Sequence, residues 1–130
     1  MKVVLDTNVL IAGFISRGLC EEIVEFCLRK KILLISMALL DELSRVLSAK
    51  FHIPPAKVSR TIIFLKTHAC VINAIARTYS HLKDPTDTFL LDLAVQGKAD
   101  VIVTGDKGLL SLKSIEHIPI ITPREFYSKL

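Results

Sequence analysis

The chain has 130 residues, 51% of them hydrophobic, which gives one domain spanning residues 1–130 enough apolar side chains for a substantial core. Its net charge of +4 is compatible with a polyanionic partner, but so small an excess also serves solubility alone. No apolar stretch approaches the roughly 18 residues that a membrane-spanning helix needs, so the sequence predicts no membrane span.

Apolar runs bounded by turn residues alternate with stretches of helical periodicity. Residues 2–6 predict a strand, and the residues after it, up to Gly18, predict a loop. From Leu19 to Lys30 apolar residues recur at helical spacing, with acidic residues in the first turn and basic residues in the last. Further strands are predicted over 32–35, 69–72, 100–103 and 118–121, and further helices from Ser36 to about Ala49, from Pro55, from Asp84 to Gly97 and after Pro123.

This alternation predicts an α/β fold, a three-layer α/β/α sandwich around a central parallel five-stranded sheet. A doubly wound strand order of 3-2-1-4-5 would place the first strand beside the fourth. Asp6 ends the first of these strands, and Asp106 follows the fourth in Thr104-Gly105-Asp106. Because ligands bind beyond the carboxyl ends of such strands, we expect both carboxylates at a functional site.

Cysteine usage and the start of the chain bear on its compartment. Cys20, Cys27 and Cys70 form an odd set without a C-x-x-C pair, which is typical of reduced cysteines. The N-terminus leads directly into a predicted strand, with no charged leader or cleavage site. We therefore expect a cytoplasmic protein.

Helical geometry selects two further carboxylates. At about 100° per residue, Glu42 lies at the edge of the apolar stripe of its helix, whereas Asp41 points nearly opposite. In the helix from Asp84 to Gly97, the same arithmetic places Asp87 inward and Asp92 outward. Asp6, Glu42, Asp87 and Asp106 are therefore the candidate site residues.

Each candidate also has a structural interpretation. Asp6 would anchor a loop, Glu42 would be an ordinary boundary residue, and Asp87 and Asp106 would cap helices. Four converging carboxylates, however, raise one another's pKa or require a cation. Hard oxygen ligands without His or Cys favour Mg²⁺ or Mn²⁺ over Zn²⁺.

In order and spacing, four motifs resemble the PIN-domain ribonucleases over essentially the whole chain, and among them the group of toxin components of prokaryotic toxin–antitoxin pairs. The first motif is Asp6-Thr7-Asn8 after an apolar run. The other three are Glu42-Leu43, Asp84-Pro85-Thr86-Asp87 and Thr104-Gly105-Asp106. The resemblance implies a PIN fold and a Mg²⁺- or Mn²⁺-dependent endoribonuclease whose catalytic and metal-binding residues are the four acids. It also implies an RNA substrate, an antitoxin protein that blocks the acidic cleft, and a homodimer.

The resemblance gives supporting roles to three polar residues. Asn8 and Thr104 would hold the carboxylates and the attacking water, and Asp84 is an alternative to Asp87 as the third acid. Because an acidic site repels a phosphate chain, a basic rim must supply affinity for RNA. The candidates for this rim are Arg17, Arg45, Lys50 and Lys107.

Two other classes of protein remain as alternatives. One is a catalytically silent PIN-like module that binds proteins. The other is a Mg²⁺-dependent phosphatase or phosphoacceptor domain, but the haloacid-dehalogenase type needs a second Asp where this chain has Asn8. For the homodimer, the apolar run Ile62-Ile63-Phe64 and a mean hydropathy of +0.48 predict an interface on the helices after the second strand.

Overall fold

The computed structural model describes residues 1–76 and 85–130. The strands are β1 (Val3–Leu5), β2 (Leu34–Ser36), β3 (Cys70–Ile72), β4 (Val101–Val103), β5 (Ser114–Ile115) and β6 (Ile118–Ile121). The helices are α1 (Thr7–Ile15), α2 (Leu19–Arg29), α3 (Met37–Ala49), α4 (Pro55–His68), α5 (Pro85–Gln96), α6 (Lys107–Ser111) and α7 (Pro123–Tyr127).

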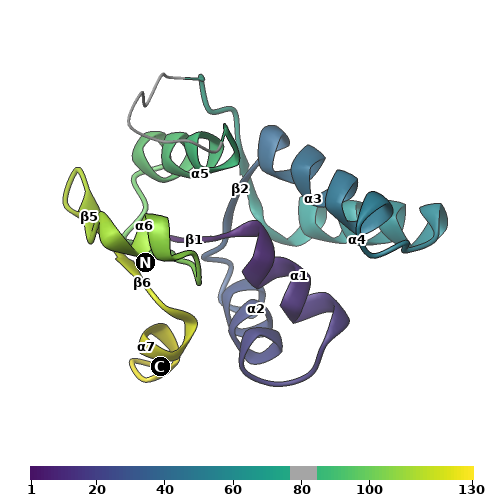
Figure 1. Cartoon of the computed structure of the whole chain (residues 1–130), viewed down its shortest axis with the longest axis horizontal. Helices are drawn as coiled ribbons and strands as arrows, with labels where there is room; N and C mark the ends of the chain where they lie inside the picture. The colour runs from purple at the N-terminus through teal and green to yellow at the C-terminus, as the bar shows by residue number, and fades with distance from the viewer. Residues whose placement is uncertain (77–84) are drawn as a thin grey trace.

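The strands form the middle layer of a three-layer α/β/α sandwich, as predicted. Helix α5 packs on β1 and β2 from one side, whereas α2 and α7 pack together on the other side (Figure 1). Helices α3 and α4 contact each other, and α3 also contacts α1 and α5 (Figure 1). Strands β1 and β4 are completely or almost completely buried between these layers.

The sheet places β1 next to β4, as the predicted order requires. Val3 to Leu5 pair in parallel with Val101 to Val103, and β6 pairs in parallel with the other edge of β4. Strands β2 and β3 form a second parallel pair, joined to β1 by a bridge between Val3 and Leu33. The carboxyl ends of β1 and β4 therefore lie side by side.

The prediction of an entirely parallel sheet is wrong at one edge. The short strand β5 pairs antiparallel with β6 through a two-residue turn, Glu116-His117. Both turn residues have positive φ, 45° and 70°, which is the geometry of a tight hairpin turn but lacks its usual Asn-Gly signature. The hairpin therefore gives no recognisable signal in the sequence.

The loop predicted after the first strand is also wrong, because α1 occupies it. Val9, Leu10 and Ile11 are all buried, so apolar residues surround this helix and leave no amphipathic stripe. Gly13 lies where α1 meets α2, and a Cβ there would come within 2.5 Å of Cγ2 of Val24. The glycine permits this close approach of the two helices.

No helix in residues 1–76 or 85–130 is both long enough and apolar enough to cross a bilayer.

Cys27 predicts a loss of stability at alkaline pH. Cys27 lies on α2 and is buried in the hydrophobic core. This burial raises the pKa of its thiol to about 12, against 9.0 for an ordinary thiol. Since the unfolded chain ionises first, the stability that this shift contributes is present below pH 9 and is lost as the pH rises from about 9 to about 12, by up to about 1.4 kcal/mol per pH unit.

Urea unfolding at pH 8 and pH 10 measures this effect. Other groups also titrate in this range, so the comparison is with Cys27→Ala, which we expect to lose less stability between the two pH values than the wild type. Cys70 is exposed, and Cys70→Ala should keep the wild-type difference. An equal pH dependence in Cys27→Ala and wild type would contradict the prediction.

Candidate metal-binding active site

Asp6 lies where β1 ends and α1 begins. Its N–H donates to the carbonyl of Val103, and its own carbonyl accepts the first hydrogen bonds of α1, from Val9 and Leu10. Only 7% of Asp6 is exposed, and its side chain makes no capping hydrogen bond to α1. The backbone thus fixes a nearly buried carboxylate whose charge α1 does not use for capping.

Thr104 connects the ends of β1 and β4. Its side chain is completely buried, and its Oγ1 donates to Oδ2 of Asp6 at 2.6 Å. The same oxygen accepts a hydrogen bond from the backbone N–H of Asp106 at 3.0 Å. One hydroxyl therefore holds both the Asp6 carboxylate and the backbone that carries Asp106.

Asp106 is exposed at the start of α6 and is the N-cap of that helix. Its Oδ2 accepts a hydrogen bond from the N–H of Leu109 at 2.9 Å. The capping role considered from the sequence is therefore present. It uses one carboxylate oxygen and holds the side chain at the edge of the pocket described below.

Glu42 lies on α3. The N-cap of this helix is Ser36, whose Oγ accepts a hydrogen bond from the N–H of Leu39 at 3.2 Å. The side chain of Glu42 is 15% exposed and pairs with Arg45, one turn further along. The guanidinium donates from Nη2 to Oε1 at 2.6 Å and from Nε to Oε2 at 3.2 Å. Asp41, by contrast, is exposed, as its helical phase predicted.

These acids meet at one cavity of about 290 Å³. Its lining residues are Asp6, Thr7, Asn8, Glu42, Arg45, Val46, Ala49, Lys50, Asp87 and Asp106. Of the predicted basic rim, Arg45 and Lys50 thus belong to the lining, whereas Arg17 and Lys107 are exposed and do not. Asp84 lies outside the described residues.

The donor set of the cavity suits a hard divalent cation. Its carboxylates come from the N-caps of α1 and α6 and from within α3 and α5, and no His or Cys is among its lining residues. As the side chains stand, no three His, Cys, Asp or Glu residues in the described part of the chain are arranged to hold one ion. Because Mg²⁺ keeps several waters and uses one or two carboxylates directly, the residues fit such an ion with water completing its coordination.

Thr7 is a cavity residue that the sequence did not single out beyond its motif. It is 4% exposed, and its Oγ1 is buried without a hydrogen-bond partner in the described structure. A buried hydroxyl without a partner costs free energy and is uncommon in proteins. The only sequence signal for it is its place between Asp6 and Asn8.

Comparison with known proteins decides the family. A family model described as PIN domain matches residues 2–108. The chain belongs to this family. PIN domains are generally nucleases and generally use divalent metal ions. The family predicted from the sequence motifs is thus confirmed.

The PIN fold is also seen in a solved structure. The crystal structure of VapBC2 from Rickettsia felis bound to a DNA fragment from their promoter contains a similar chain, with a TM-score of 0.68. The similarity covers 94% of this chain and 98% of that one, at 16% sequence identity, so it concerns the fold. No curated protein matches the sequence.

The prediction that Asp92 of this PIN domain points outward is wrong. Asp92 is 2% exposed. The residues on both sides of it, from Leu90 to Ala94, are buried as well, because α5 is covered on more than one face. A single buried stripe therefore does not describe this helix, and the helical-phase argument fails for it.

We expect Asp92→Ala to destabilise the PIN domain by about 1–3 kcal/mol, because truncating a side chain buried in the core leaves a cavity. Thermal or urea unfolding measures this loss. The control is Asp41→Ala on the exposed face of α3, which should change stability by no more than about 0.5 kcal/mol. Equal stability of the two variants would contradict the burial argument.

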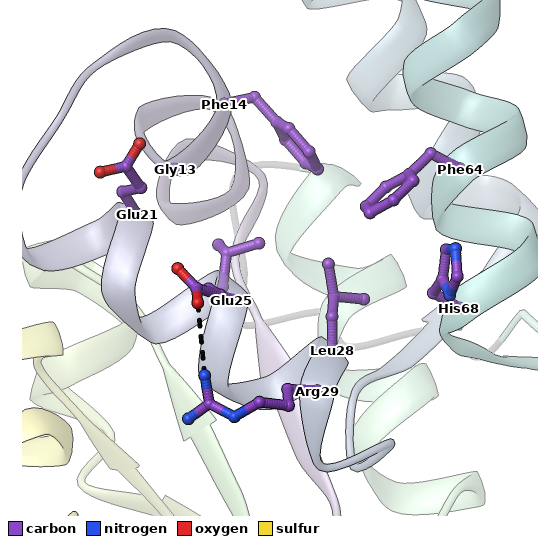
Figure 2. Close-up of a pocket in the computed structure, with 9 residues that line it drawn as sticks. Gly13, Phe14, Glu21, Glu25, Leu28, Arg29, Phe64 and His68 are labelled. Carbon is purple, nitrogen blue, oxygen red and sulfur yellow. Dashed lines mark hydrogen bonds and ion pairs between the residues drawn. The ribbon is translucent and has the colours of Figure 1, made fainter.

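A second cavity, of about 350 Å³, lies away from the acids between α1, α2 and α4. Phe14 and Phe64 meet edge to face across it, with ring centroids 6.5 Å apart, and the His68 ring contacts Phe64 at a tilt (Figure 2). Its rim carries the ion pair between Glu25 and Arg29, 3.3 Å long (Figure 2). Most of its lining is apolar, although Glu21 and Glu25 of α2 also line it.

Proposed function

We propose that this PIN domain is a divalent-metal-dependent endoribonuclease that hydrolyses RNA phosphodiester bonds in the acidic cavity. The observation that carries the proposal is the meeting of Asp6, Glu42, Asp87 and Asp106, from four separate elements, at one cavity. Asp6 and Asp106 would be the central ligands of Mg²⁺ or Mn²⁺. Glu42 and Asp87 would be outer ligands or would orient the attacking water.

The residues of the chain have distinct tasks in this scheme. A bound divalent ion supplies a more acidic water and stabilises charge on the phosphate in the transition state. Thr104 holds the Asp6 carboxylate in place, and Asn8 offers an exposed amide at the cavity. Lys50 lines the same cavity and supplies positive charge for a phosphate, because the carboxylates alone would repel RNA.

Cleavage assays with purified protein test the activity. Labelled single-stranded RNA, structured RNA and DNA of the same sequence are incubated with Mg²⁺, Mn²⁺ or EDTA. We expect metal-dependent cleavage of RNA that EDTA abolishes and added Mn²⁺ restores. Cleavage that persists in EDTA would contradict the metal requirement, and preferential cleavage of DNA would contradict the substrate. No cleavage of any substrate would favour the catalytically silent module.

We also propose that the chain is the toxin of a toxin–antitoxin pair and that its antitoxin blocks the acidic cavity. The support is the resemblance of its motifs to such toxins and the similar fold in the VapBC2 structure. Induced expression in a bacterial host tests this. Wild type should arrest growth, and Asp6→Asn should not. Equal growth of the two strains would contradict a toxin role.

A homodimer through the helices after β2 is the last part of this proposal. Ile63 is 62% exposed and Phe64 43% exposed on α4, so this helix presents apolar surface to solvent. Light scattering at micromolar concentration should give twice the 14.5 kDa of one chain. Ile63→Glu should shift the mass toward the monomer. Ile75→Glu, at a residue 75% exposed outside α4, should not. A wild type of 14.5 kDa alone would contradict the dimer.

A further inference from the structure

The pairing of Glu42 with Arg45 engages both oxygens of a carboxylate that faces the proposed metal site. Oε1 accepts from Nη2 at 2.6 Å and Oε2 from Nε at 3.2 Å. The hydrogen bonds from Thr104 to Asp6 and from Leu109 to Asp106 each reach one oxygen, Oδ2. A guanidinium therefore holds Glu42 at both carboxylate oxygens, in the two-point geometry that makes such pairs strong.

From this geometry we infer that Arg45 is a positioning residue that competes with the divalent ion for Glu42; the inference rests on the proposed metal-dependent function. The guanidinium places a positive charge at both oxygens through which Glu42 would bind a cation. Both residues line the same cavity, so the competition takes place inside the site. A cation that binds Glu42 through the lone pairs that Arg45 uses would displace Arg45.

The arrangement of the other acids agrees with this competition. Four carboxylates line the cavity, yet no three potential ligands in the described part of the chain are arranged to hold one ion. Release from Arg45 would make the Glu42 carboxylate available as a further ligand. On this inference, the ion pair keeps Glu42 from joining the other carboxylates as a ligand.

Displacement from Glu42 would also allow Arg45 to bind a phosphate group. Its side chain is 66% exposed, so a guanidinium released from Glu42 stays at the mouth of the cavity. Guanidinium binds phosphate oxygens in the same two-point way that it binds a carboxylate. Metal loading would therefore make the Arg45 guanidinium available to a phosphate of RNA.

Mn²⁺ binding, followed by the loss of the electron paramagnetic resonance signal of free Mn²⁺, tests the competition without an activity assay. We expect Arg45→Gln to bind Mn²⁺ with a Kd at least about threefold lower than wild type, equivalent to about 0.7 kcal/mol. Part of any such gain comes from losing one positive charge. Lys50→Gln is the matched control, because Lys50 lines the same cavity but its Nζ lies 6.0 Å from the centroid of the Phe51 ring.

The double variant separates competition from general charge. In a Glu42→Gln background, Arg45→Gln should give no further gain beyond that of Lys50→Gln in the same background, because the ion pair is already broken. A gain of equal size with and without Glu42, or equal gains from Arg45→Gln and Lys50→Gln in the wild-type background, would overturn the inference.

The same data distinguish failure of the inference from failure of the proposed function. If wild type and Arg45→Gln both bind no Mn²⁺, the metal-dependent function is overturned, and the inference with it. If wild type binds Mn²⁺, Asp6→Asn does not, and Arg45→Gln binds like wild type, the metal site stands and the competition is overturned. Detectable binding only after Arg45→Gln would support the competition in its strongest form.

Discussion

Asp6→Asn should lower metal-dependent RNA cleavage by at least about a hundredfold, as expected for loss of a group at the reacting centre. Asn has nearly the same shape as Asp, and its amide oxygen can still accept the hydrogen bond that Thr104 donates to Asp6 at 2.6 Å. The change therefore removes charge while keeping the contact. Initial rates of cleavage at saturating Mn²⁺ measure the loss.

Stability provides the complementary measurement. Removing one charge from a group of four carboxylates relieves repulsion, so Asp6→Asn without metal should unfold at the same temperature as wild type or higher. Asp106→Asn should likewise unfold at the same temperature as wild type or higher, because Asn is as good an N-cap as Asp for α6. Asp41→Asn, on the exposed face of α3, is the control and should cleave at the wild-type rate. Asp6→Asn that cleaves RNA like wild type would contradict the site assignment.

The sequence predicts two kinds of element well: helices with a single buried face, and strands that are buried on both faces. Strands β1 and β4 are continuous apolar runs, and α2 alternates apolar and charged faces, so their periods are visible in the sequence. Helix α1 is apolar nearly all round and contains Gly13, which conceals its period. Strand β5 has two residues, too few for any period to appear.

The site divides in the same way. Asp6 and Asp106 follow from topology, because the carboxyl ends of adjacent parallel strands must meet. Glu42 follows from helical phase, because α3 buries one stripe. Asp92 does not, because α5 is buried on several faces and phase no longer tells inside from outside. The pairing of Glu42 with Arg45 depends on side-chain rotamers, which a sequence pattern does not fix.

Thr104→Val should impair both activity and stability, because one hydroxyl serves two partners. Valine keeps the shape of threonine but cannot donate to Oδ2 of Asp6 or accept from the N–H of Asp106. Thr104 is completely buried, so water cannot easily replace these bonds. We expect cleavage to fall by about 10- to 100-fold, as for residues that orient metal ligands, and the free energy of unfolding to fall by about 1–3 kcal/mol.

Thr104→Ser separates the hydroxyl from the packing. Serine keeps the donor and acceptor and loses one buried methyl group, so it should retain most of the activity while losing some stability. If the hydroxyl positions Asp6, Thr104→Val should also bind Mn²⁺ more weakly than wild type, whereas Thr104→Ser should bind it like wild type. A purely structural role would lower the stability of both variants and leave the Mn²⁺ affinity of both unchanged. That outcome would contradict a positioning role, because it would mean that Asp6 reaches its working geometry without Thr104.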